Sequence, residues 1–91
     1  MADLLVLPEI LDLKAAAPLK AELLARRGRD LVLDASGVQR LGGLCLQVLL
    51  SAARTWAADG VNLRLGSVSQ PLGEQWAAFG APDLINEGAQ A

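Results

Sequence analysis

The sequence predicts one small α/β domain in which helices mainly cover one face of a small sheet. Three short apolar runs with strand character, at residues 4–7, 31–33 and 61–65, alternate with three segments of helical period. This order favours right-handed crossovers, which pack helices onto a sheet. The 91 residues, 53% of them hydrophobic, suffice for one core without a separate catalytic module.

The first third of the chain predicts a strand followed by a helix. The apolar run of residues 4–7 ends at Pro8, and Leu11 and Leu13 either prolong this strand or lead into the helix. Residues 15–27 are rich in Ala, Leu, Lys, Glu and Arg, which favour a helix.

The middle of the chain predicts a buried strand joined to a strongly apolar helix. The unbroken apolar run of residues 31–33 indicates burial on both faces, as in parallel pairing, and Asp34 ends it. A helical period covers residues 43–58, after which Asp59 and Gly60 close the helix.

The last third predicts a third strand, at residues 61–65, and a third helix capped by Ser67 or Ser69. Three side chains at helical spacing on this helix are expected to pack in the core: Leu72, Trp76 and Phe79. Residues 84–85 are expected to pack back onto the domain before a polar tail that starts at about residue 86.

The residue types argue against most enzymes and against nucleic-acid binding. The chain has no histidine, the commonest general base and transition-metal ligand, so no enzyme, metal or cofactor is expected. Its net charge is −2 and its basic residues are scattered, which is unlike a nucleic-acid-binding surface. Asp34 and Ser36 could serve in phosphate binding or as a hydroxyl nucleophile. The favoured interpretation is structural: Asp and Ser side chains form turns by hydrogen bonding to nearby backbone amides.

Two further features bear on the environment of the chain. The single cysteine, Cys45, forms no intrachain disulfide and is expected in the core. No signal-peptide pattern and no apolar run of the roughly 20 residues that span a bilayer is present, so we expect a cytoplasmic protein without membrane insertion.

The stretch from Leu31 to Leu50, with a strand, a turn and a Gly-Gly pair that opens a helix, resembles the signature of STAS domains. In this family, the fold of bacterial anti-sigma factor antagonists, Asp-Ser-Ser-Gly-Leu opens the corresponding helix. The resemblance implies a STAS-like small mixed sheet with helices mainly covering one face, and a protein that binds a partner.

The phosphorylation site of the resembled family is degenerate here. By alignment of the strand and the helix, Gly43 stands where the family carries its phosphorylated Ser or Thr, and Gly42 stands at the Asp of the signature. Glycine has no hydroxyl and cannot carry the roughly two negative charges of a phosphate. The on/off switch that the resemblance implies is therefore expected to be absent.

The predicted partner surface runs from the turn into the helix. Leu44 and Val48 are apolar residues on the otherwise polar side of the helix at residues 43–58, and either a partner or neighbouring loops cover them. The Gly-Gly pair either admits the close approach of a partner or only forms a tight turn. The predicted partner-binding residues are Gln39, Arg40, Gly42, Gly43, Leu44, Gln47, Val48, Ser51 and Thr55.

The leading hypothesis is a non-catalytic protein-binding module in bacterial signal transduction or chemotaxis. It would dock a regulatory or chemotaxis-type kinase, or an anti-sigma factor, without phosphorylation at Gly43. The resemblance leaves a second hypothesis, a STAS subunit of a lipid-trafficking ABC transporter, although such subunits usually retain Ser or Thr at this position. Two more hypotheses stay open: the apolar residues of the helix form a homodimer, or Asp34 and Ser36 serve an enzyme.

Overall fold

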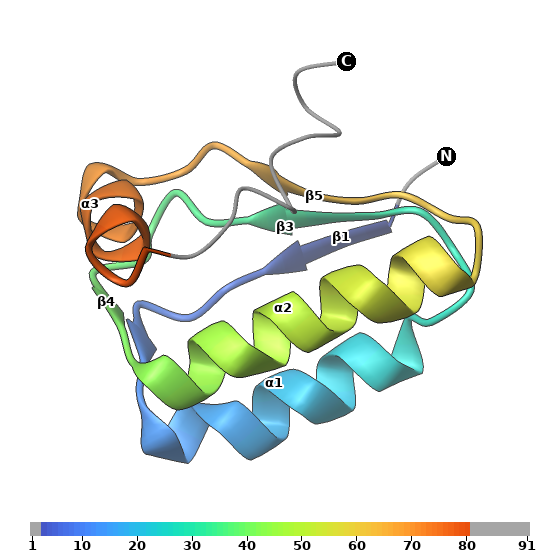
Figure 1. Cartoon of the computed structure of the whole chain (residues 1–91), viewed down its shortest axis with the longest axis horizontal. Helices are drawn as coiled ribbons and strands as arrows, with labels where there is room; N and C mark the ends of the chain where they lie inside the picture. The colour runs from blue at the N-terminus through green and yellow to red at the C-terminus, as the bar shows by residue number, and fades with distance from the viewer. Residues whose placement is uncertain (1–2, 81–91) are drawn as a thin grey trace.

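The computed structural model describes residues 3–80 and arranges them in two layers, a small sheet and the helices packed on it (Figure 1). The predicted α/β class is confirmed. The elements, in chain order, are β1 (Asp3–Val6), β2 (Ile10–Leu11), α1 (Leu13–Ala25), β3 (Leu31–Asp34), β4 (Arg40–Leu41), α2 (Gly43–Ala58), β5 (Leu63–Gly66) and α3 (Gln70–Ala78).

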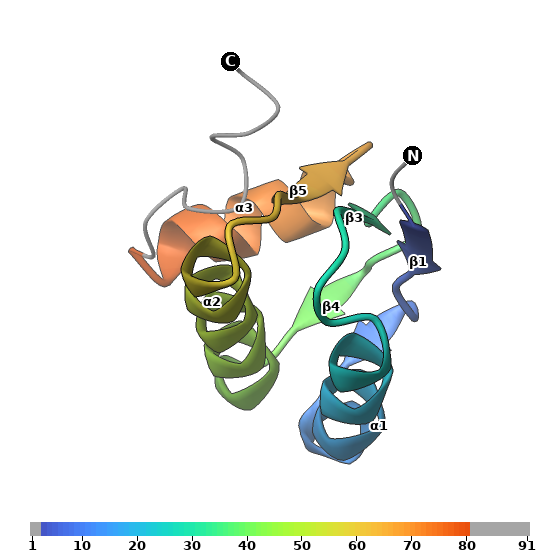
Figure 2. The same ribbon diagram turned by 90° about the vertical axis from the view of Figure 1, so that its right-hand side faces the viewer.

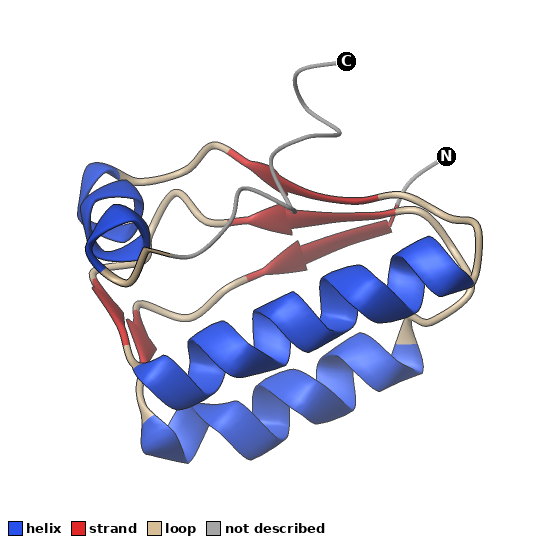
Figure 3. Ribbon diagram, viewed as in Figure 1, coloured by secondary structure: helices blue, strands red, loops and turns tan. Residues whose placement is uncertain are grey.

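The main sheet has the strand order β1-β3-β5, with β3 in the centre. Leu31 pairs with Asp3 on one side and with Leu63 on the other, and both pairings are parallel. A second, two-stranded sheet joins β2 to β4, also in parallel (Figure 3). All strand pairs within residues 3–80 are therefore parallel rather than mixed. The apolar run of β3 is buried on one face only, since Leu31 and Leu33 are buried and Val32 is half-buried.

Both long helices cover the same face of the main sheet. Because the strands follow one another across the sheet in one direction, right-handed crossovers place α1 and α2 on one side. Figure 2 shows this arrangement, and Figure 1 shows α3 at the carboxyl ends of the strands, beside β4. The predicted one-sided cover is thus confirmed for α1 and α2.

The start of α1 differs from the prediction because a two-residue strand precedes it. Leu11 belongs to β2, where it pairs with Leu41, and Leu13 is the first residue of the helix. Asp12 caps α1: its carboxylate accepts the N–H of Ala15 at 3.2 Å. The helix ends at Ala25, two residues before the predicted end.

The last helix confirms two of its three predicted core residues. Ser69, not Ser67, caps α3 and accepts the N–H of Leu72 at 3.2 Å. Leu72 and Trp76 are buried, but Phe79 is 48% exposed, so its placement in the core was wrong. Phe79 follows the last helical residue, and Gly43, which lies beside its ring, has no side chain to cover it. The predicted contact of residues 84–85 and the polar tail lie outside the described residues.

The core lies between the main sheet and the helices. Trp56 is 2% exposed and donates its indole N–H to the carbonyl of Arg29 at 2.8 Å, which ties α2 to the loop before β3. No helix within residues 3–80 combines the length and the apolar character needed to cross a bilayer. The other fully buried core side chains, apart from alanine, are Leu11, Leu31, Leu33, Val38, Cys45, Leu49 and Leu72.

Candidate functional site

The turn after β3 is held by the side chains of Asp34 and Ser36. The Asp34 carboxylate accepts the N–H of Ser36 at 3.0 Å and its hydroxyl at 2.7 Å. Both bonds lower the pKa of Asp34, and the bond from the Ser36 backbone N–H has the larger effect. The interpretation of this pair as turn-forming is confirmed, since the Ser36 hydroxyl is donated to the carboxylate two residues before it.

The stretch at residues 39–41 is fixed by a residue far away in the sequence. Gln75 of α3 accepts the N–H of Leu41 at 2.6 Å through its side-chain oxygen and donates its amide to the carbonyl of Gln39 at 2.9 Å. Glu9 also contributes, because its carbonyl accepts the N–H of Gln39 at 2.7 Å. The side chains of Gln39 and Arg40 are exposed at this edge.

The two glycines at the start of α2 have different surroundings. Gly42 is the N-cap, and its N–H donates to the carbonyl of Leu11 at 2.8 Å. A Cβ atom on Gly42 would lie 3.2 Å from that carbonyl oxygen, whereas one on Gly43 would meet only the Phe79 ring, at 3.9 Å. The absence of a side chain at Gly42 therefore lets the backbone of Leu11 come close to the start of α2. Gly43, by contrast, is exposed and has room for a side chain.

Cys45, in the first turn of α2, is a core residue as predicted. Its thiol is buried and donates to the carbonyl of Asp12 at 3.2 Å. Burial, and secondly the charge of Asp12, raise the pKa of this thiol. The thiol is therefore held as a neutral group that anchors the start of α2 to the start of α1.

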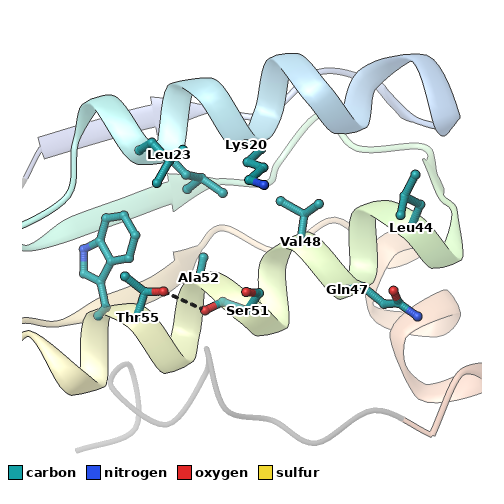
Figure 4. A pocket seen from close by; sticks show the side chains of 10 residues that line it. Lys20, Leu23, Leu44, Gln47, Val48, Ser51, Ala52 and Thr55 are labelled. Carbon is teal, nitrogen blue, oxygen red and sulfur yellow. Dashed lines mark hydrogen bonds between the residues drawn. The ribbon is translucent and has the colours of Figure 1, made fainter.

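The predicted residues of α2 line an open groove between α1 and α2, with a volume of about 230 Å³. In Figure 4, Leu44 and Val48 point from α2 into the space beside α1, and Lys20 points into it from α1. Leu44 is 46% exposed and Val48 is half-buried, so neighbouring loops of the described chain do not cover Leu44. All residues that line the groove are Lys20, Leu23, Leu24, Leu44, Gln47, Val48, Ser51, Ala52, Thr55 and Trp56.

The structure thus divides the predicted site into two parts. Five of the predicted residues meet in the groove: Leu44, Gln47, Val48, Ser51 and Thr55. The other four, Gln39, Arg40, Gly42 and Gly43, precede the groove and do not line it.

Three residues near the predicted site were missed. Phe79 lies over Gly43 and exposes almost half of its surface. Lys20 and Leu24 form the opposite wall of the groove, and Leu24 is 55% exposed. The one available signal was weak: Leu24 is a large apolar residue four positions after Lys20 on the helix, whereas contacts between distant segments leave no local pattern.

A parallel sheet covered on one face by two helices, with a short second sheet and a third helix at the carboxyl ends of its strands, defines a small α/β domain. The family model described as "Mlab, STAS domain" matches residues 2–86. The chain therefore belongs to the STAS domain family, as the resemblance predicted. Comparison with characterised proteins gives no match.

The general role of this family is known at a coarse level. STAS domains are generally non-catalytic modules that mediate protein–protein interactions. Within residues 3–80 no three His, Cys, Asp or Glu side chains gather in an arrangement that could hold a metal ion.

Proposed function

We propose that this protein is a cytoplasmic, non-catalytic STAS module of bacterial signalling that docks a regulatory or chemotaxis-type kinase, or an anti-sigma factor. The docking surface runs from Gln39 to Thr55 and acts without phosphorylation at Gly43. The observation that carries the proposal is the convergence of five residues from that surface in one open groove, with Leu44 46% exposed at its edge.

The surroundings of Gly43 support docking without a phosphate. The two side chains beside this residue are apolar and half-exposed, Leu44 in sequence and Phe79 in space. A partner that covers both removes apolar surface from water, which is the main favourable contribution to most protein association. Gly43 itself has no hydroxyl, so no phosphate can form at this position to control that contact.

The experiment is an affinity capture from the native bacterial lysate, read by mass spectrometry, with the wild-type chain and the Leu44→Asp variant. A charge buried in a desolvated contact costs several kcal/mol, so we expect Leu44→Asp to lose the partner. Leu4→Asp is the matched control, because Leu4 is 60% exposed on β1, away from the groove. Circular dichroism checks that both variants keep the fold.

Three results would contradict the proposal. Capture of kinases and anti-sigma factors that is equal for wild type and Leu44→Asp would show that the surface is not used. Recovery of the ATPase of a lipid-trafficking ABC transporter, lost in Leu44→Asp, would instead support the transporter function. A Leu44-dependent dimer in sedimentation experiments would assign the surface to self-association.

A further inference from the structure

The groove between α1 and α2 has an apolar floor and a single charged side chain. Leu23, Ala52 and Trp56 form the floor and are 3%, 6% and 2% exposed. Lys20 is the only charged residue of the lining, and it takes part in none of the ion pairs within residues 3–80. Those ion pairs are Arg26–Glu22, Arg27–Asp59 and Arg29–Asp3.

The α2 wall of the groove has the spacing of a helix-packing seam. Leu44, Val48, Ser51 and Thr55 lie at i, i+4, i+7 and i+11, the spacing by which two helices interlock. From Leu44 to Thr55 the wall runs about 16 Å, or three helical turns. A segment of about three turns therefore matches the length of the groove.

Both walls of the groove are helices, which decides the kind of segment that fits. The backbone groups of α1 and α2 are used within the helices, so neither wall offers a strand edge on which an extended peptide could add. Thr55 uses its hydroxyl within α2, where it donates to the Ser51 carbonyl at 3.1 Å. Recognition in this groove therefore depends on side chains: the apolar ones, the Lys20 ammonium, and the polar groups of Gln47 and Ser51.

We propose that the groove takes an amphipathic helix of the partner, with its apolar stripe against Leu44 and Val48 and a carboxylate paired with Lys20. This inference rests on the proposed function and specifies the element by which the partner docks. The charge argument is that Lys20, a cation without an ion-pair partner among the described residues, lies at the edge of an apolar surface. A carboxylate of the incoming helix gains attraction and specificity there.

The test uses two synthetic helical peptides of about three to four turns that share one leucine stripe. One peptide carries a glutamate beside the stripe, and the other carries a lysine at the same position. Each is titrated into the isotope-labelled full-length chain, and amide shifts of α1 and α2 report the binding site and the affinity. The glutamate peptide should bind the wild-type chain about fivefold more tightly than the lysine peptide.

Charge reversal in the protein supplies the decisive comparison. Lys20→Glu should invert the preference between the peptides, whereas Lys14→Glu should leave it unchanged, because Lys14 is an exposed lysine of the same helix that does not line the groove. Leu44→Asp should abolish binding of both peptides. Equal affinities for the wild type, an inversion that Lys14→Glu also produces, or shifts that map outside the groove would overturn the proposal.

The peptide test and the lysate capture fail in different ways. Absence of binding by either peptide at millimolar concentration would reject a helix in the groove, while a captured partner lost in Leu44→Asp would still uphold the docking surface. Charge-selective peptide binding without any Leu44-dependent partner would uphold the groove and reject the signalling function.

Discussion

The adjacent glycines at the start of α2 should respond to alanine with opposite signs. A methyl group on Gly42 would lie 3.2 Å from the Leu11 carbonyl oxygen, which is backbone and is held by the N–H of Gly42 itself. A methyl group on Gly43 would meet only the edge of the Phe79 ring, at 3.9 Å, an ordinary van der Waals distance.

The expected magnitudes follow from these contacts. For Gly42→Ala, overpacking costs about 1–3 kcal/mol and the poorer N-cap about 0.5–1, against a gain of about 0.4–1 from the stiffer unfolded chain. The net loss is about 0.5–3.5 kcal/mol, centred near 2, and a loss of about 2 kcal/mol lowers Tm by roughly 8–16 °C for a domain of this size. Gly43→Ala should instead gain about 0.5 kcal/mol, since alanine favours the first helical turn.

Urea and thermal unfolding of the two variants, followed by circular dichroism, measure these differences. Stability losses of equal size in both variants would refute the reasoning, because they would mean that Gly43 also requires the absence of a side chain. If Gly43→Ala keeps full stability but weakens partner capture, the residue at position 43 contacts the partner.

Three more predictions concern residues around the site. Gln75→Ala should cost about 1–3 kcal/mol in urea unfolding, because the partly buried Leu41 N–H loses its acceptor, whereas Gln70→Ala on the exposed side of α3 should change little. The buried thiol of Cys45, with its raised pKa, should not react with a disulfide reagent at pH 8 until the chain unfolds. The lowered pKa of Asp34 means that its contribution to stability is present above the unfolded pKa of about 3.9 and is lost as the pH falls through the folded value. Asp34→Asn should therefore flatten the acid side of the stability profile, and an unchanged profile would contradict this assignment.

Which segments form helices and which form strands was predictable where the sequence carries a local signal. The predicted and observed ranges of α2 coincide because glycines open the helix and Asp59 and Gly60 close it, with Gly60 at a φ of +72°. The run at residues 31–33 correctly indicated a parallel central strand, but burial on both faces was wrong: Leu31 and Leu33 are buried, whereas Val32, which points to the opposite face, is half-buried.

The misses share a physical cause, which is that the missing information lies in distant contacts. Strands β2 and β4 have two residues each, too few to show a period, and they exist because the segments at Leu11 and Leu41 meet. Phe79 has the spacing of a core residue, yet exposure depends on whether another element covers the end of α3. The groove arises from the distance between α1 and α2, which neither helix encodes alone.

The parallel order of the sheet has a consequence for how the chain folds. Asp3 pairs with Leu31 and Leu31 pairs with Leu63, so each contact of the central strand closes a loop of about thirty residues. No hairpin within the described chain can start the sheet, and folding must wait for non-local pairing, which is slow compared with helix formation. During synthesis, the sheet is complete only when β5, in the last third of the chain, has left the ribosome.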